Sequence, residues 1–199
     1  MEFRRSGYPC LRVGTPEERF ARIGMIARWK PVHLGHAAVL RALASRADEV
    51  LIGIGSSNRV NVRNPFSAGE TRAMLALALE EAAHVTVVDV PDLDDGPRWR
   101  AMVVEVFGDL DAFVTANPYV ARLLAGDYPI LRPVDLVPLD ERVPVDGTGV
   151  RREMARGEGW RDLVPPEVAR YIVEHGLDQR FRNEFGLETL ALDAPPLVR

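Results

Sequence analysis

Residues 23–36 read IGMIARWKPVHLGH, and this stretch decides how the chain can fold. Its first half, 23–29, is a short apolar run of the kind that forms a buried strand. Good helix formers with helical spacing follow at 36–45, so residues 30–35 form a strand-to-helix turn. In α/β proteins such a turn aims backbone N–H groups at a bound phosphate. The stretch therefore predicts an α/β fold with a phosphate-facing loop after its first strand.

The alternation of strand and helix continues along the chain. We expect further strands at 49–55, 85–90, 111–116 and 129–137, the last interrupted by proline, and helices at 67–83, 98–107, 118–124, 150–156 and 165–175. Apolar strands alternating with helices indicate a parallel sheet that is covered on both faces. The sequence thus predicts a Rossmann-like, doubly wound five-stranded parallel sheet with a helical C-terminal portion. We expect an N-terminal arm at 1–20, one domain at 21–186 and a C-terminal tail at 187–199.

The composition is that of an ordinary globular protein. Of its 199 residues 47% are hydrophobic, and the formal net charge of −4 gives no basic field that would attract nucleic acid or an anionic membrane. No apolar run approaches the roughly 18 residues that span a bilayer, and the first residues lack the apolar core of a secretory signal. The single cysteine, Cys10, excludes an internal disulfide and the usual zinc frameworks. We therefore expect a cytoplasmic protein that binds neither nucleic acid nor membranes.

Two of the four histidines lie in the first loop, three residues apart. This spacing can place the imidazoles of His33 and His36 on the same side, and Gly35 between them lets a nucleotide approach the backbone. A phosphate monoester, whose second pKa is about 6, is already an anionic nucleophile and needs no general base. Its attack on a nucleoside triphosphate needs alignment and donors or cations that stabilise the phosphoryl oxygens. A zinc site is the less favoured alternative, since no further ligands stand at helical spacing.

Lysine occurs once among the 25 basic residues, at Lys30, and this lysine lies between Arg28 and His33. A compact, flexible ammonium at that place would add positive charge near a polyphosphate. Lys30 is therefore a candidate catalytic residue, with chance usage as the alternative.

A second motif, DGTGVRR at 146–152, stands at the predicted start of a late helix. A hydroxyl such as that of Thr148 caps free N–H groups or meets a phosphate there, and Arg151 can fork onto phosphate oxygens. The carboxylate of Asp146 would repel a triphosphate beside it, and a role as the helix cap is the alternative for this residue. A capped surface helix without function is the alternative for the whole motif.

These motifs together resemble a known family over residues 21–180. The first loop is similar to the HxGH signature of the nucleotidylyltransferase superfamily, and its surroundings resemble GRFQPxHxGH of the archaeal-type nicotinamide mononucleotide (NMN) adenylyltransferases. The segments that carry the rest of the resemblance are GIGSS at 53–57, NPFSAGE at 64–70, the Asn117-Pro118 pair and GTGVR at 147–151. The resemblance implies transfer of AMP from ATP to NMN, giving NAD and pyrophosphate.

The resemblance also implies roles for individual residues. With these roles the expected catalytic residues are His33, His36, Arg151 and Lys30, although Lys30 stands where the family has glutamine and is expected from its position and charge alone. The residues expected to bind ATP are Arg28, Gly35, Asn117, Gly147, Thr148 and Arg152. Those expected to bind the acceptor are Asp92 and Trp99, with Arg98 added for its charge. The resemblance implies Mg²⁺ that arrives with the triphosphate rather than on protein ligands, a small phosphate-bearing acceptor as second substrate, and a homo-oligomer.

Three departures from the family pattern keep other functions open. Thr71 replaces an arginine, Asp146 replaces a serine, and Gly96 stands where the archaeal-type enzymes usually carry an asparagine. Trp99 favours a cationic pyridinium, since stacking of a cation on an indole is worth about 0.5–2 kcal/mol, although a plain core position is the alternative. Arg98 would suit the carboxylate of the nicotinate nucleotide. The alternatives are therefore adenylyl or cytidylyl transfer to another phosphate or phosphonate, and a nucleotide-binding regulatory module without catalysis.

Overall fold

Five parallel strands form the centre of the molecule. The computed structural model describes residues 18–80 and 82–192. The strands are β1 (Phe20–Ala27), β2 (Ala47–Gly55), β3 (Val85–Val90), β4 (Ala112–Val114) and β5 (Ile130–Leu131), in the order β3-β2-β1-β4-β5. Every pairing between neighbouring strands is parallel. The predicted Rossmann-like, five-stranded parallel sheet is confirmed.

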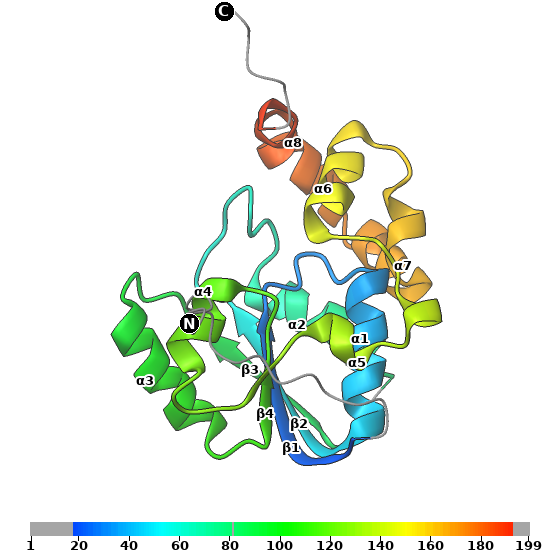
Figure 1. Cartoon of the computed structure of the whole chain (residues 1–199). Coiled ribbons are helices and arrows are strands. Elements are labelled where there is room, and N and C mark those ends of the chain that lie inside the picture. Colours follow the sequence, from blue (N-terminus) through cyan, green and yellow to red (C-terminus); the bar gives the residue numbers. More distant parts are fainter. Residues whose placement is uncertain (1–17, 81, 193–199) are drawn as a thin grey trace, which may run out of the picture.

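Helices cover both faces of this sheet (Figure 1). They are α1 (Leu34–Arg46), α2 (Ala68–Ala78), α3 (Gly96–Phe107), α4 (Pro118–Leu124), α5 (Pro133–Leu136), α6 (Gly147–Arg156), α7 (Pro166–Glu174) and α8 (Leu177–Ala191), with short 3-10 turns at Leu139–Glu141 and Trp160–Leu163. Figure 1 shows α3 and α4 on one side of the strands, α1 and α5 on the other, and α6, α7 and α8 grouped beyond the carboxyl edge. Within the described residues, no helix has the length and apolarity needed to cross a bilayer.

Neighbouring residues of the strands alternate between two hydrophobic cores. Val50 and Ile52 of β2 pack into the larger core, which includes residues of α1, α2 and the C-terminal helices. Leu51, between them, joins the smaller core with Phe107 of α3 and Phe113 of β4. Because both faces are covered, the strands need apolar residues at successive positions, and this explains the continuous apolar runs in the sequence.

Three predicted strands end earlier than expected, and one of them is the fourth, which was expected at 111–116 but is β4 (Ala112–Val114). The fifth was expected at 129–137, but β5 stops at Leu131 and Pro133 begins helix α5. Proline has a fixed φ and no N–H to donate, so it suits the first turn of a helix better than a sheet. The first strand was expected to reach Trp29, but β1 ends at Ala27 and Trp29 has a φ of 56°.

The C-terminal prediction is wrong for part of its length. A tail was expected from residue 187, but α8 is helical through Ala191, and residues 193–199 lie outside the described part. Arg180 fixes this helix to the body, because its guanidinium donates to the Glu70 carboxylate at 2.5 and 2.8 Å. Of the predicted arm at 1–20, residues 1–17 lie outside the described part, and Phe20 already belongs to β1.

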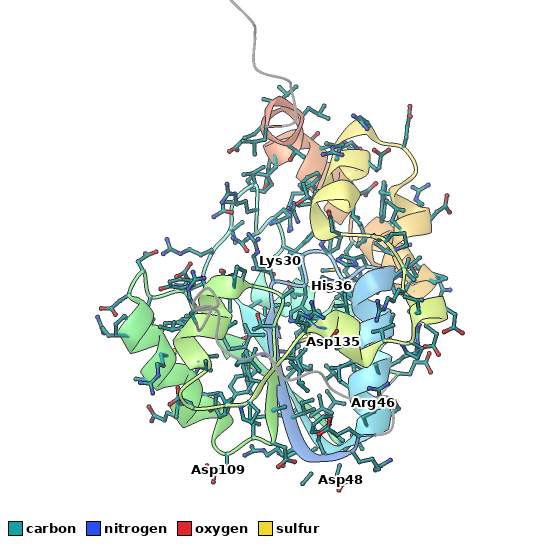
Figure 2. The ribbon with its side chains drawn as sticks, viewed as in Figure 1. Lys30, His36, Arg46, Asp48, Asp109 and Asp135 are labelled. Carbon is teal, nitrogen blue, oxygen red and sulfur yellow. The ribbon has the colours of Figure 1, made fainter. Side chains whose placement is uncertain are left out.

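The sheet topology fixes where a ligand can bind. From β1 the chain moves to β2 on one side, whereas β4 lies on the other side of β1. Connections that diverge from neighbouring strands leave a crevice at their carboxyl ends, the usual ligand site of doubly wound sheets. Figure 2 shows Lys30 and His36 at this edge, and Asp48 and Asp109 at the opposite one.

Candidate active site

A cavity of about 1440 Å³ opens at the carboxyl edge of the sheet. Most of the predicted site residues line it: Arg28, Lys30, His33, Gly35, His36, Asp92, Trp99, Asn117, Gly147, Thr148 and Arg151. Arg98 and Arg152 do not. Arg98 is exposed on α3 and is not among the residues that line the cavity, so its role toward the acceptor stays a prediction.

His33 caps the helix that follows it. Its Nδ1 accepts a hydrogen bond of 3.2 Å from the backbone N–H of His36, so in the neutral ring the hydrogen is on Nε2. Burial lowers the pKa of His33 to about 4; Asp146 raises it and Arg151 lowers it further. At neutral pH the ring is therefore an uncharged donor with its Nε2–H available to a ligand.

His36 stacks on His33, with ring centroids 3.6 Å apart and planes 20° from parallel. Burial and the neighbouring His33 hold the pKa of His36 well below its usual range, against an opposing effect of the Pro31 carbonyl. Its Nδ1 is buried and has no hydrogen-bond partner in the described part of the chain. Trp29 supports the ring at 4.7 Å between centroids, and its indole N–H is fixed by a 2.9 Å bond to the Gly53 carbonyl.

Gly35 allows a distant segment to approach this histidine pair. A Cβ at position 35 would lie 2.9 Å from the carbonyl oxygen of Val145 and 3.2 Å from the His33 ring. Real Cβ atoms do not come that close to a backbone oxygen, so any larger residue would push the 145–147 segment away. Gly35 therefore allows the loop after β1 to pack against the segment that begins α6, in addition to any approach of a nucleotide.

Arg151 joins the start of α6 to the first loop. Its Nη1 donates to the Lys30 carbonyl at 3.0 Å, and its Nη2 donates to the Thr148 hydroxyl at 3.2 Å. Burial lowers the pKa of Arg151 to about 10, and Arg28 acts in the same direction. The guanidinium remains a cation at neutral pH, and it lines the cavity beside His33.

Lys30 has hydrogen-bond partners that the sequence did not indicate. Its side chain is 2% exposed, and its Nζ donates to the carbonyls of Ser56 at 3.1 Å and Arg59 at 3.4 Å. Burial, followed by Arg28, lowers the pKa of Lys30 to about 8. The ammonium therefore holds the loop after β2 against the loop after β1, in addition to lining the cavity. Sequence spacing alone could not identify those carbonyls.

The departures at 71 and 146 have structural explanations. Asp146 caps α6, because its Oδ1 accepts a 2.8 Å bond from the Gly149 N–H, so the capping interpretation is confirmed. Thr71 is buried, and its hydroxyl donates to the Ser67 carbonyl at 2.7 Å. Arg72, the next arginine, donates to Val87 and Asp89 of β3 rather than lining the cavity.

The other end of the cavity is rich in carboxylates. Asp92 is held by Asn58, which donates to its carbonyl at 2.9 Å and accepts from its N–H at 2.8 Å. Asp95 caps α3 through a 2.9 Å bond from the Arg98 N–H. Trp99 packs in part against the smaller core and in part lines the cavity, so its core contacts are observed and its stacking on an acceptor ring stays a prediction.

Tyr119 is a lining residue that the sequence reasoning missed. It follows Asn117, whose Oδ1 accepts a 2.9 Å bond from the Tyr119 N–H and so caps α4. Its proximity to the Asn117-Pro118 motif was the available signal. Among the described residues no group of three or more His, Cys, Asp or Glu side chains could hold a metal ion.

Comparison with known proteins places this site in a family. Residues 28–153 match the cytidylyltransferase-like family model. A nicotinamide-nucleotide adenylyltransferase of Methanocorpusculum labreanum is 35% identical over 77% of this chain and 92% of its own length. The enzyme of the same name from Picrophilus torridus is 36% identical over 81% of this chain and 96% of its own.

Solved structures show the same fold. A bifunctional NMN adenylyltransferase/ADP ribose pyrophosphatase from Francisella tularensis has a TM-score of 0.69 and 18% identity. The alignment covers 88% of this chain and 57% of that longer protein. At 18% identity the similarity shows the fold alone. The relatives at 35% identity are matched over nearly their whole length, and they show the family. The chain belongs to the cytidylyltransferase-like family of HxGH nucleotidyltransferases and, within it, to the group of the nicotinamide-nucleotide adenylyltransferases.

Proposed function

We propose that this protein transfers AMP from ATP to nicotinamide mononucleotide, releasing NAD and pyrophosphate. The observation that carries the proposal is the stacked, uncharged pair His33 and His36 lying beside Arg151 at one end of a single large cavity. The relatives at 35% identity bear the name of this activity. The opposite end of the cavity, where Trp99 lies near the carboxylates of Asp92 and Asp95, suits a cationic ring.

The reaction is an in-line displacement at the α-phosphorus of ATP. A phosphate oxygen of NMN forms the new P–O bond, while the bond from the α-phosphorus to the bridging oxygen breaks and its electron pair leaves with pyrophosphate. His33, through Nε2–H, and His36 would donate to the phosphoryl oxygens as charge develops there. Arg151 and Arg28 would balance the triphosphate charge, and the N–H groups at the start of α6 would add positive potential. Lys30 acts chiefly by holding the loops that carry these groups.

A divalent cation would enter with the nucleotide. The described residues offer no cluster of metal ligands, which fits an ion held by phosphate oxygens and water. Mg²⁺ is our proposal for that ion, and one solved relative of the same fold was crystallised with AMP and a manganese ion. When bound, the cation neutralises charge on the leaving pyrophosphate.

Pyrophosphate release from purified protein tests the proposal. Reactions should pair ATP or CTP with NMN, the nicotinate nucleotide, or a simple phosphate or phosphonate. We expect the highest kcat/KM with ATP and NMN, and NAD as the product. Nucleotide binding without pyrophosphate release from any pair would favour the regulatory-module alternative, and faster turnover of another pair would reassign the acceptor.

Two further expectations accompany this proposal. We propose a homo-oligomer in the cytoplasm, and both parts await measurement by light scattering and by cell fractionation. A monomer at assay concentration would contradict the first, and recovery outside the cytoplasmic fraction would contradict the second.

A further inference from the structure

A tyrosine hydroxyl occupies the space where residue 96 has no side chain. A Cβ built on Gly96 would overlap the hydroxyl oxygen of Tyr119, whereas the ring carbon Cζ would be at an ordinary 3.5 Å. Gly96 begins α3 and Tyr119 lies near the start of α4, so two helices place these residues together. Any larger residue at position 96 would therefore displace the hydroxyl from its present place.

This hydroxyl is available to a ligand. The Tyr119 side chain is 54% exposed, and its hydroxyl has no hydrogen-bond partner within residues 18–80 and 82–192. Tyr119, Gly96 and Trp99 all line the same cavity. A phenol both donates and accepts, so it can bond a carboxamide through either of that group's polar atoms.

The charges around this place favour an uncharged ring substituent. Asp92, Asp94 and Asp95 line the cavity at this end, and Arg59, the partner of Asp94, does not line it. The arginines and the lysine that do line the cavity belong to the β1–α1 loop, α6 and the segment before α6: Arg28, Lys30, Arg142 and Arg151. Carboxylates attract a pyridinium ring, but they repel a carboxylate substituent on it.

We infer that Tyr119 is a specificity-determining residue of the acceptor site: its hydroxyl, in the space left by Gly96, hydrogen-bonds the uncharged ring substituent of the acceptor. The inference rests on the proposed function, because it takes the ligand at Trp99 to be a nicotinamide-type nucleotide. It names the group that hydrogen-bonds the ring substituent, and it explains the glycine at position 96, which leaves room for that group.

Tyr119→Phe removes the hydroxyl and keeps the ring. We expect the KM for NMN to rise about two- to tenfold, the effect of one ordinary hydrogen bond, with kcat and the KM for ATP unchanged. The same variant should leave the KM for the pyridinium ribotide, which lacks the carboxamide, as it is in wild type. Tyr171→Phe, which removes a hydroxyl from α7 outside the cavity, is the matched control and should change neither KM.

Gly96→Ala tests the spatial relationship. The overlapped atom is at the end of an exposed side chain, so the ring should turn away while the fold is kept. Gly96→Ala should therefore raise the KM for NMN as Tyr119→Phe does, and the double variant should be no worse than either one. Thermal unfolding of each variant controls for damage to the fold.

The outcomes separate this inference from the proposed function. If wild type forms no NAD from ATP and NMN, the proposed function is wrong. If wild type is active and Tyr119→Phe shows an unchanged KM for NMN, or an equal rise for the pyridinium ribotide, only the inference about Tyr119 is overturned. If the double variant raises the KM for NMN by the product of the two single effects, the two substitutions do not act through the same hydroxyl, and the inference is likewise overturned.

Discussion

The guanidinium of Arg151 donates a 3.0 Å hydrogen bond to the carbonyl of Lys30, although 121 residues separate the two. This bond joins the loop after β1 to the first turn of α6. Because His33 lies in the same loop and Gly147 in the same turn, one surface of the cavity combines the two motifs. A polyphosphate bound there would contact hydrogen-bond donors from the loop after β1 and from the start of α6.

Arg151→Gln should separate these two segments. In the proposed reaction the variant loses a fixed cation beside the phosphoryl group on which charge develops, so we expect kcat to fall about 10²- to 10³-fold with the fold retained. Steady-state kinetics and thermal unfolding measure the two effects. Arg156→Gln on the same helix, where the arginine is exposed and paired with Glu153, is the control and should keep full activity. Equal activity of both variants would remove Arg151 from the mechanism.

His33→Asn separates capping from catalysis. Asparagine is a good N-cap, so the helix should keep its first turn, but it lacks the Nε2–H donor. We expect near wild-type thermal stability and a large loss of kcat. His33→Ala should lose the same activity and, in addition, about 1 kcal/mol of stability from the missing cap. Full activity of His33→Asn would show that the cap is all that His33 supplies.

The buried neutral His33 should also make the protein sensitive to acid. Its pKa is about 4 when folded against an ordinary value of 6.5, so between these values the unfolded chain binds the proton more readily. The contribution of neutral His33 to the free energy of unfolding should therefore be complete above pH 6.5 and decrease as the pH falls toward 4. Urea unfolding at several pH values should show a flatter dependence for His33→Asn. An identical dependence in both proteins would contradict the neutral buried state.

Lys30 should produce an alkaline limb in the pH profile. Burial and Arg28 lower its pKa to about 8, so the ammonium loses its proton above that pH and the cavity loses a positive charge. The kcat/KM for ATP should decline above pH 8 in wild type. Lys30→Gln should be folded and slower, and it should lack this limb. Persistence of the limb in the variant would assign it to another group.

The carboxylate of Asp146 caps α6 and lies at the end of the cavity where we propose that the triphosphate binds. Asp146→Ser and Asp146→Asn both preserve a capping oxygen and remove the charge. We expect the KM for ATP to fall about two- to fivefold in each, less so at high salt, because screening weakens the repulsion. Asp140→Asn removes an exposed charge away from the cavity and is the matched control. A raised KM in both cap variants would mean that the carboxylate assists binding.

Much of the fold could be predicted from local sequence, and the third strand matched residue for residue at Val85–Val90. Periodicity failed where proline changed the element, as at Pro133, and where polar residues obscured a helix, as in α8. In that helix the segment FRNEF at 181–185 has three polar residues between its two phenylalanines, so the apolar stripe is weak. The attachment of the helix through Arg180 to Glu70 spans 110 residues. Contacts of that kind are not visible in local patterns.

The parts of the site that lie within sequence motifs could be predicted. The loop containing His33 and the turn before Arg151 could both be identified, because phosphate-binding turns need particular residues at fixed spacing. The partners of Lys30 and the proximity of Tyr119 to Gly96 depend on which loops and helices meet in three dimensions. Residue type and position beside Trp99 also suggest Arg98, yet Arg98 does not line the cavity.

A crystal structure with NMN and a non-hydrolysable ATP analogue would show where the triphosphate binds. The triphosphate should lie between the first loop and α6, with a phosphoryl oxygen within hydrogen-bond distance of both His33 Nε2 and the Arg151 guanidinium. A triphosphate bound elsewhere, or one that touches neither group while the analogue fully occupies the cavity, would contradict the account.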